Sequence, residues 1–403
     1  MLNQLLVHQV RRRLESLGLP VEVELWDGRR LGQNALAAVR VRLNRLSSLK
    51  ALAYPNLGTL ARAYVCGDLD LEGDARDILS LGGRLCDTQG VPAKTGPGNW
   101  KWWRHTRVRD RKNIQYHYDV SNDFYGLWLD RRRVYSCAYF QTPDMSLEAA
   151  QVAKLDHICR KLNLKPGERL LDIGCGWGGL ILHAAQHYGV EAVGITLSDD
   201  QLDYARRQID ELGLSGSVSV RKMDYRDMRE VESYDKIASV GMFEHVGQAN
   251  LSRYFSTISG LLKPGGLILN HGITTAEPEA VGLGSGIAEF IDDYVFPGGE
   301  LVHVSDVLRA AAKSGLECLD AENLRPHYGK TLWHWVQRLE SHADEARRLI
   351  GEHKYRIWRI YMAGSAHAFD HGWMELWQVL AGKAVDGQQP DYPFSRDYIY
   401  GPQ

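Results

Sequence analysis

The segment best suited to chemistry is ERLLDIGCGWGG, which spans residues 168–179. It holds a short apolar run, then Asp172, and then glycines at positions 174, 176, 178 and 179 that open a helical pattern. A strand that runs through a glycine-rich turn into a helix lets backbone N–H groups approach a nucleoside-containing ligand closely. The segment therefore predicts a nucleoside-binding turn.

The spacing of these glycines distinguishes two kinds of nucleoside ligand. A dinucleotide site has the spacing G-x-G-x-x-G, with the helix N-terminus facing a pyrophosphate. Here the pattern is D-x-G-x-G, which suits a ligand with a cationic centre and no phosphate. The next strand ends in GITLSDDQ rather than in the lone acid expected for a dinucleotide ribose, and Asp224-Tyr225 follows the third strand. These features favour S-adenosylmethionine over a dinucleotide.

The elements that would position this turn follow an α/β pattern from residue 116 onward. Strand patterns cover 169–174, 191–197, 218–224, 234–243 and 267–273, and helix patterns cover 147–162, 178–189, 198–214 and 251–266, the last with a glycine stop. Strands that alternate with crossover helices predict a mostly parallel sheet with right-handed connections, and the loops after its strands meet at one edge. Residues 331–381 are predicted to be rich in helix.

A smaller α+β domain is predicted before this sheet. Residues 1–18 have the pattern of an amphipathic helix, and 21–31 and 34–43 alternate as two strands joined by an Asp27-Gly28 turn and a short loop. The segment 90–100 is rich in Gly and Pro, which is typical of a domain boundary. We expect an N-terminal domain over residues 1–95, a linker over 96–115 and a catalytic domain over 116–403.

The linker contains WKWWRHTRVRDRK, residues 100–112, in which three tryptophans are interleaved with six Lys or Arg and one Asp. Two interpretations remain open. The segment is a solvated connector whose tryptophans pack on a domain, or it is an amphipathic surface that lies on anionic lipid with its indoles at the interface.

Composition limits the remaining function classes. The chain has 403 residues, 44% of them hydrophobic and 24% charged, which is ordinary for a globular protein. Its formal net charge of -2 argues against binding nucleic acid through bulk charge. Six cysteines without C-x-x-C or zinc-like spacing indicate reduced thiols in the cytoplasm and no metal site. No apolar run approaches the roughly 18 residues of a membrane span, so any membrane contact is expected to be peripheral.

Seven ordered motifs together resemble one known family, the cyclopropane-fatty-acyl-phospholipid synthases and the related mycolic acid cyclopropane synthases. They are YHYDVSNDFYGLWLD (116–130), RVYSCAYF (133–140), LLDIGCGWGG (170–179), GITLS (194–198), SVGMFEHVG (239–247), YVFPGGEL (294–301) and HYGKTLWHW (327–335). The resemblance is strong over 116–403. It is weaker over 1–99, where RAYVCGDLDLEGDARDIL resembles the family's lipid-engaging domain.

The resemblance implies a Rossmann-like class I S-adenosylmethionine-dependent methyltransferase domain preceded by a small α+β lipid-engaging domain. The family transfers the donor's methyl group to a cis double bond of a phospholipid acyl chain, and the ring closes as a proton is lost to bound bicarbonate. An alkene is a poor nucleophile, so the site must hold the sulfonium against it and shelter the carbocation from water. The resemblance also implies a homodimer that works at the inner face of the membrane.

Site residues are implied only where this sequence matches the family's motifs. The bicarbonate site and the catalytic role would fall to Cys137, Glu244, His271, Ile273 and Tyr328. The donor site would comprise Tyr135, Ser136, Asp172, Gly174, Cys175, Gly176, Thr196, Leu197, Gln201, Tyr225 and Arg226. Taken singly, His271 would pass for a core histidine and Tyr328 for a core aromatic. The sequence shows no general base next to Cys137, so we expect this cysteine to bind the ligand rather than to act as a nucleophile.

One position departs from the family. The segment YMAGSAHAF (361–369) has Ser365 where many members carry a cysteine once considered catalytic. A serine without a nearby base is no nucleophile, so we expect a structural role there. Three other functions remain as alternatives. They are a same-family enzyme that makes methylene- or methyl-branched chains, a soluble small-molecule methyltransferase, and a non-catalytic lipid-binding protein.

Overall fold

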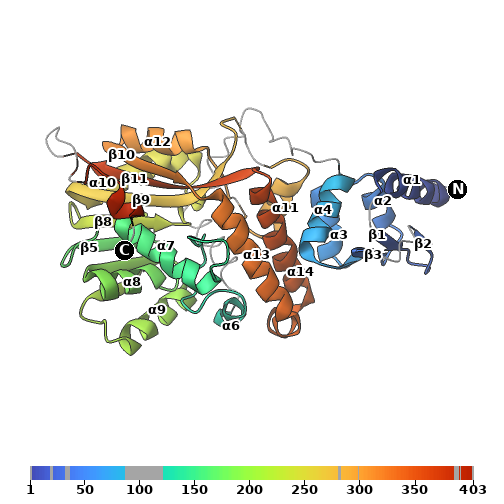
Figure 1. Ribbon diagram of the computed structural model, residues 1–403, viewed down its shortest axis with the longest axis horizontal. Helices are drawn as coiled ribbons and strands as arrows, with labels where there is room; N and C mark the ends of the chain where they lie inside the picture. Colours follow the sequence, from blue (N-terminus) through green and yellow to red (C-terminus); the bar gives the residue numbers. More distant parts are fainter. Residues whose placement is uncertain are drawn as a thin grey trace. The chain divides into compact units, whose positions relative to one another are not determined.

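The computed structural model describes residues 2–18, 21–31, 37–86, 121–279, 283–297, 299–384, 390 and 392–401. The chain divides into two compact units. The small unit comprises Met1–Thr95, Gly282–Pro297 and Leu332–Trp373, and the large unit comprises Gly96–Val281, Gly298–Thr331 and Met374–Gln403. Figure 1 labels the helices and strands of both units.

The large unit is built on a sheet in which seven described strands follow the order β10-β11-β9-β8-β5-β6-β7. Its strands are β5 (Arg169–Ile173), β6 (Glu191–Thr196), β7 (Val218–Lys222), β8 (Tyr234–Val240), β9 (Leu262–Thr275), β10 (Leu316–Asn323) and β11 (Met374–Lys383). The run from β9 to β7 is parallel, whereas β11 pairs antiparallel with both β9 and β10. The predicted, mostly parallel sheet is therefore confirmed.

Helices cover both faces of this sheet (Figure 1). They are α6 (Asn122–Gly126), α7 (Leu147–Lys161), α8 (Gly179–Tyr188), α9 (Asp199–Glu211), α10 (Leu251–Leu261), α12 (Val304–Lys313) and α15 (Asp397–Tyr400), and α13 (Arg325–Ser341) begins in this unit. Side-chain caps fix where two of them start, because Ser146 accepts from Ala149 N and Ser198 accepts from Gln201 N.

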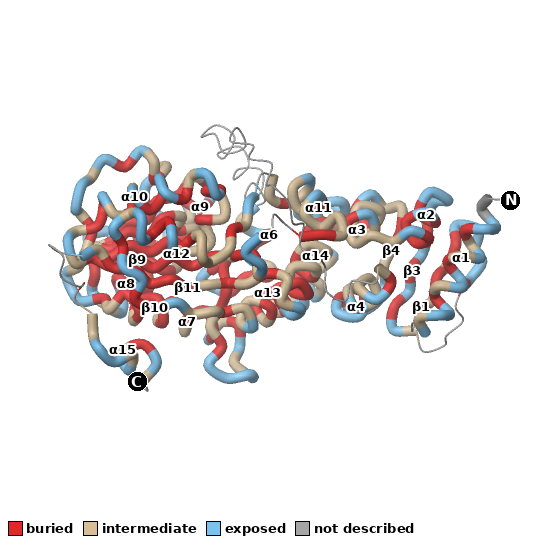
Figure 2. The backbone as a smooth tube through the Cα atoms, turned by 90° about the horizontal axis from the view of Figure 1, so that it is seen from above, coloured by how far each residue is buried: buried red, intermediate tan, exposed pale blue. Residues whose placement is uncertain are grey.

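Two apolar clusters sandwich the central strands. One joins side chains of α7, α8 and α9, and the other joins those of α10 and α12. The strands between them are buried on both faces, as Figure 2 shows. Parallel strands that are covered on both faces have near-continuous apolar sequences, and for this reason RLLDI and EAVGIT could be predicted to be strands.

The small unit has a sheet of its own, with four described strands in the order β2-β1-β3-β4. Its strands are β1 (Val21–Glu24), β2 (Arg30–Leu31), β3 (Val39–Leu43) and β4 (Leu69–Glu72), and its helices are α1 (Leu2–Leu17), α2 (Ser48–Ala53), α3 (Leu57–Val65), α4 (Ala75–Leu85), α11 (Ile287–Tyr294), α14 (Ala343–Asp370) and the rest of α13. Phe290 of α11 and Ile357 of α14 belong to the same apolar core as the strands.

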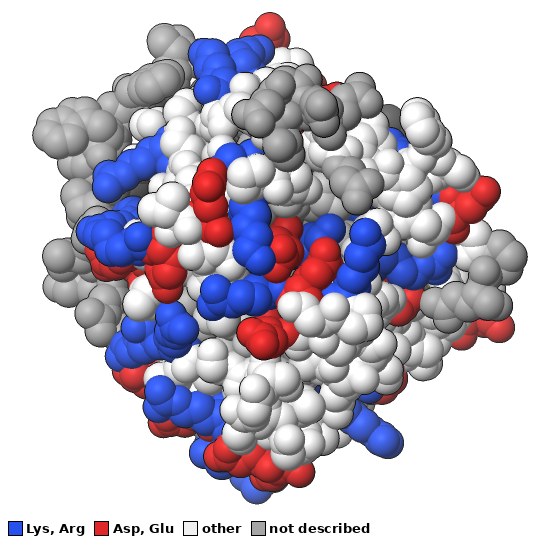
Figure 3. All heavy atoms as spheres, turned by 90° about the vertical axis from the view of Figure 1, so that its left-hand side faces the viewer, with Lys and Arg blue, Asp and Glu red and all other residues white. Residues whose placement is uncertain are grey.

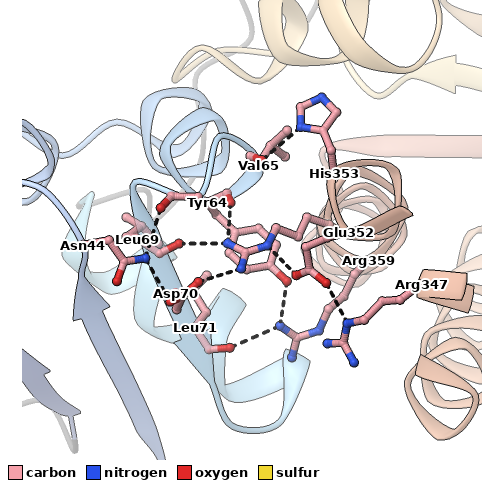
Figure 4. Close-up of polar contacts among 12 residues, drawn as sticks. Asn44, Tyr64, Val65, Leu69, Asp70, Leu71, Arg347, Glu352, His353 and Arg359 are labelled. Atoms are coloured by element: carbon pink, nitrogen blue, oxygen red, sulfur yellow. Dashed lines mark hydrogen bonds and ion pairs between the residues drawn. The ribbon is translucent and has the colours of Figure 1, made fainter. Parts of the chain in front are cut away.

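Two arginines of α14, the buried Arg359 and the partly buried Arg356, tie this helix to β4 and α3. Arg359 donates to Tyr64 Oη (3.2 Å) and to the carbonyl of Leu71 (3.4 Å), as Figure 4 shows. It also donates to the carbonyl of Gly73 (3.2 Å) and pairs with Glu340 at 2.7 Å. One turn earlier, Arg356 pairs with Asp70 at 2.7 Å and donates to the carbonyls of Tyr64 and Leu69. The long C-terminal helix is thereby an integral part of the small unit.

This division differs from the expected domains. Residues 282–297 and 332–373 were assigned to a catalytic domain over 116–403, but they share a core with residues of 1–95. The expected linker, 96–115, and its basic tryptophan segment lie outside the described residues.

Three local predictions are also corrected. The segment 374–383 is the strand β11 rather than helix, because its partners are β9 and β10, which lie far away along the chain. The Asp27-Gly28 turn folds β2 back onto β1, whereas β1 and β3 pair in parallel. Helix α10 ends at Leu261 and passes directly into β9, so the glycines of KPGG lie in the strand rather than in a helix stop.

The surface agrees with the low net charge. In the view of Figure 3, Lys and Arg side chains lie next to Asp and Glu side chains over much of the face. Surface ion pairs such as Arg221–Glu230 (3.2 Å) and Lys383–Glu232 (3.0 Å) have this character. In the described part of the chain, we find no helix whose length and apolar character would suffice to cross a membrane.

Candidate active site

A cavity of about 1170 Å³, which includes the open space at its mouth, lies at the carboxyl ends of the parallel strands of the large unit. All of the residues predicted to bind the donor line it, namely Tyr135, Ser136, Asp172, Gly174, Cys175, Gly176, Thr196, Leu197, Gln201, Tyr225 and Arg226. Tyr135 and Ser136 precede α7, and the other residues lie at the carboxyl ends of β5, β6 and β7 or in the segments that follow them. The structure thus brings the predicted donor site together around one cavity.

The turn after β5 is shaped to leave space for a ligand. The N–H groups of Gly174 and Cys175 both donate to Ile195 O at 3.0 Å, which fixes the start of the turn. Gly176 has a φ of 54°, and a Cβ added there would meet no protein atom within 4 Å. A glycine with positive φ and open space above it lets a ligand lie directly on the backbone.

The loops after β6 and β7 are held by their own side chains. Thr196 Oγ1 donates to Gln201 Oε1 at 2.8 Å and accepts from Ser198 N at 3.2 Å. Arg226 and Asp224 form a bidentate pair with contacts of 2.6 and 2.9 Å. These contacts fix polar groups at two further points of the cavity wall, with Tyr225 beside them.

Asp172 is almost fully buried in this wall, with 2% of its surface exposed. Burial raises the pKa of its carboxyl to about 7, and the nearby Lys154 opposes this rise. Its Oδ1 has no hydrogen-bond partner among the residues that the structure describes, so one carboxylate oxygen is available for a ligand.

Lys154 of α7 is a residue that the sequence analysis missed. It lines the cavity, is 1% exposed and donates to Ser136 Oγ at 2.9 Å. Burial lowers its pKa to about 8. Its signal in the sequence is a polar residue on the apolar face of a helix, four residues from both Ala150 and Ile158.

A second group of predicted residues surrounds Glu244, which follows β8 in the short 3-10 helix η3 (Phe243–His245). Glu244 Oε1 accepts from Ile273 N at 2.8 Å, whereas its Oε2 is buried and has no partner within the described part of the chain. Burial raises the pKa of Glu244 to about 7. His271 precedes Ile273 by two positions on β9, so both residues face the same side of the sheet.

His271 is also buried, with 1% exposed. Burial moves its pKa well below the ordinary value, so the ring is neutral at physiological pH. Gln378, directly opposite on β11, donates through Nε2 to His271 Nδ1 at 3.1 Å. A neutral imidazole that accepts at Nδ1 carries its proton at Nε2, and none of the described residues bonds to this buried Nε2.

The two remaining predicted residues lie near Leu324. The Sγ of Cys137 is 3.9 Å from Leu324 O, and Tyr328 N donates to the same carbonyl at 3.1 Å. Burial raises the pKa of the Cys137 thiol, which argues against a thiolate nucleophile there. None of the five predicted anion-site residues is part of the lining of the donor cavity.

Ser365 lies elsewhere. It is a half-buried residue of α14 and belongs to the small unit.

Gly272 is a position where a side chain would disturb the second group. A Cβ added there would lie 2.0 Å from Phe243 Cε1 and 3.3 Å from Glu244 Oε1. We expect Gly272→Ala to displace Phe243 and the Glu244 carboxylate, and to lower turnover more than affinity for the donor. Titration calorimetry with S-adenosylhomocysteine, beside a turnover assay, measures both. Wild-type turnover in this variant would show that the contact is unimportant.

Comparison with known proteins identifies the family. Residues 105–379 match the profile of the family described as mycolic acid cyclopropane synthetase, and residues 10–85 match a domain of unknown function. A probable fatty acid methyltransferase of Pseudomonas putida is 43% identical over 97% of this chain and 99% of its own length.

Two solved structures are similar as well. The cyclopropane synthase MmaA2 of Mycobacterium tuberculosis has a TM-score of 0.65 at 35% identity, covering 68% of this chain and 98% of its own. Mycolic acid cyclopropane synthase CmaA1, in complex with S-adenosylhomocysteine (SAH) and CTAB, has a TM-score of 0.64 at 36% identity over the same shares. With the cavity at the carboxyl ends of the strands, these matches show that the chain belongs to the mycolic acid cyclopropane synthetase family, whose members are S-adenosylmethionine-dependent, lipid-modifying methyltransferases with the class I fold.

Proposed function

We propose that this protein transfers the methyl group of S-adenosylmethionine to the cis double bond of an unsaturated phospholipid acyl chain and closes a cyclopropane ring as a proton is lost. The observation that carries this proposal is a pair of buried polar atoms, Glu244 Oε2 and His271 Nε2, that have no partner among the described residues and lie beside a cavity suited to the donor.

The donor cavity supplies the binding half of the reaction. Asp172 offers a carboxylate oxygen to the cationic methionine part of the donor, and the turn at Gly176 leaves room for it to lie on the backbone. We propose that Tyr225 and the Thr196–Gln201 pair, which line the same cavity, contact the nucleoside part of the donor. Fixing the sulfonium in one orientation matters because an alkene reacts only when it is held against the methyl carbon.

The second group fits a small oxyanion. Two buried atoms without partners would otherwise each cost about 1–3 kcal/mol, and a ligand that accepts from one and exchanges a proton with the other removes that cost. We propose that Glu244, His271, Ile273, Cys137 and Tyr328 hold bicarbonate, which would accept the proton lost on ring closure. The chemistry of the two unpartnered groups, one N–H donor and one carboxyl of pKa about 7, matches such an ion.

Each residue has a defined task in this proposal. His271 presents its Nε2 proton because Gln378 occupies Nδ1, so Gln378 sets the tautomer. Glu244 is anchored by Ile273 N through one oxygen and exchanges a proton through the other. Because Cys137, His271 and the Oε2 atom of Glu244 are buried, we propose that little water reaches the carbocation on the acyl chain.

A second candidate is a same-family enzyme that gives methylene- or methyl-branched chains. It is favoured by the relative from Pseudomonas putida, which is described as a probable fatty acid methyltransferase. Both reactions share the methylated cation and differ only in which proton leaves or whether hydride is added.

The lipid product separates the two candidates. We expect expression in a host that lacks such lipids to yield acyl chains whose proton NMR spectrum shows ring protons far upfield. Vinylidene protons instead would establish the methylene-branching enzyme. Mass spectrometry alone is insufficient for this pair, since a ring and a methylene branch both add CH2, although a saturated methyl branch differs from them by two hydrogens. Unchanged lipids, with methyl transfer to a soluble molecule, would favour the small-molecule methyltransferase.

Membrane contact and dimer formation belong to the same proposal. A substrate embedded in a bilayer requires the enzyme to reach the lipid surface, and the basic tryptophan segment 100–112 has the composition for it. We propose a peripheral enzyme at the inner face of the membrane, acting as a homodimer. A non-catalytic lipid-binding protein is disfavoured, because such a protein would gain nothing from burying Glu244 and His271 without partners.

A further inference from the structure

Lys154 is unusual because it is a buried lysine with little to neutralise it. Its Nζ makes one hydrogen bond, to Ser136 Oγ at 2.9 Å, and no carboxylate lies within 4.0 Å of it among the described residues. The other buried lysine of the same helix, Lys161, contacts Asp320 at 3.1 Å and Glu322 at 2.6 Å. A buried ammonium without a close partner destabilises the fold by several kcal/mol. A functional role therefore explains the burial of Lys154 better than a purely structural role does.

The charges that face Lys154 come from several elements. The carboxylates of Asp130 and Asp172 favour its protonated form, whereas the buried thiols of Cys137 and Cys159, whose pKa values are raised, carry no charge near neutral pH. The ammonium in turn disfavours protonation of His271 and His183. Asp130 already accepts from Arg132 N at 3.0 Å and from Val134 N at 2.8 Å. Asp172, by contrast, has an oxygen without a partner and lines the same cavity as Lys154.

Asp172 depends on this ammonium for its charge. Burial drives its carboxyl toward the neutral form, and Lys154 is the cation that opposes burial, while the thiols of Cys159 and Cys175 are the other titratable groups nearby. A neutral Asp172 would lose its attraction for a cationic ligand. Lys154 therefore acts on the donor site through Asp172, without needing to touch the donor.

Lys154 also orients the hydroxyl group of Ser136. Because its Oγ accepts from Lys154, its own O–H proton points away from the ammonium and is available to the cavity that Ser136 lines. Gln151, one turn earlier on α7, holds the same segment by donating to the carbonyls of Val134 (3.2 Å) and Ser136 (2.9 Å). Helix α7 thus fixes both the backbone and the hydroxyl of Ser136.

We infer that Lys154 is a positioning residue of the donor site, which keeps Asp172 ionised for the ammonium and sulfonium of S-adenosylmethionine and turns the Ser136 hydroxyl toward the donor's carboxylate. One buried cation would thereby prepare two opposite partners for a zwitterionic ligand. The inference rests on the proposed assignment of Asp172 and Ser136 to the donor site.

Donor affinity as a function of pH tests this inference without any lipid substrate. Titration calorimetry with S-adenosylmethionine between pH 6 and 9 is compared for the wild type, Lys154→Met, Asp172→Asn and the double variant. We expect Lys154→Met to bind S-adenosylmethionine at least about 10-fold more weakly than the wild type at pH 7. As the pH is lowered, the affinity of the variant should begin to fall at a higher pH than the affinity of the wild type does. In the Asp172→Asn background the same change should have a clearly smaller effect and no pH dependence, because the charge it supports is gone.

Lys161→Met is the matched control, since it removes a buried lysine of the same helix that lies outside the cavity lining. We expect it to lower stability while leaving the pH profile of donor binding unchanged. Equal affinity loss with and without Asp172, or a wild-type pH profile in Lys154→Met, would overturn the inference. If Asp172→Asn itself binds the donor normally, the assignment of Asp172 is wrong, which is a distinguishable failure.

A measurement on the unaltered protein keeps the inference testable if Lys154→Met does not fold. In ¹⁵N-lysine NMR of the wild type with S-adenosylmethionine bound at pH 7, the Nζ of Lys154 should give the signal of an ammonium. A neutral amine at that position would contradict the inference.

Discussion

Glu244→Gln is expected to lower kcat by roughly 100- to 10,000-fold while leaving affinity for S-adenosylmethionine within about twofold. Glutamine keeps an oxygen that can accept from Ile273 N, so the local backbone contact is retained. It cannot exchange a proton, whereas the buried carboxyl has a pKa of about 7, which is suited to proton transfer in either direction. Turnover assays, donor titration and circular dichroism measure the three expectations separately.

The affinity for bicarbonate should depend on the protonation state of Glu244. Below pH 7 the Glu244 carboxyl is protonated and can donate to an anion, and as the pH rises through about 7 it ionises and repels the anion. Wild-type affinity should therefore fall above pH 7, and Glu244→Gln should lose this fall. Glu211→Gln, which alters an exposed glutamate of α9, serves as the control. Unaltered turnover in Glu244→Gln would remove Glu244 from the mechanism.

Arg359→Ala is expected to destabilise the small unit by about 3 kcal/mol, because it leaves Glu340 and two carbonyls of the β4 region without their buried partner. Arg359 is 9% exposed, and its guanidinium contacts residues that lie 286 to 295 positions earlier in the chain, including Tyr64. Hydrogen exchange measured by mass spectrometry should show faster exchange over residues 57–73.

Arg347→Ala is the matched control for this prediction. Its side chain is 41% exposed and pairs with Asp344, which is 98% exposed, and with Glu352. Such surface pairs contribute about 0–1 kcal/mol, so exchange over 57–73 should stay close to that of the wild type. Equal effects of the two variants would mean that the buried network around Arg359 does not hold the helix to the small unit.

Much of the central sheet could be predicted from the sequence because its signals are local. Parallel strands such as RLLDI are short apolar runs, and helices between them begin at capping residues such as Ser198. The donor-site residues follow from the same pattern, since loops after parallel strands meet at one edge of the sheet.

The missed features depend on contacts between distant residues. Strand β11 was assigned to a helix-rich region because a buried apolar run has no period that separates strand from helix, and its pairing of Gln378 with His271 spans more than a hundred positions. The same holds for α14, whose place in the small unit rests on Arg356 and Arg359. The role of Lys154 could not be predicted from the sequence, because it depends on Asp172 and Ser136 lining the same cavity.

The most direct test of the proposed reaction uses purified protein, S-adenosylmethionine with a ¹³C-labelled methyl group, bicarbonate and vesicles of an unsaturated phospholipid. The account predicts that the label appears in the lipid as the CH2 carbon of a cyclopropane ring, and that Glu244→Gln forms this product far more slowly. Label that enters a soluble acceptor and never the acyl chain would contradict it.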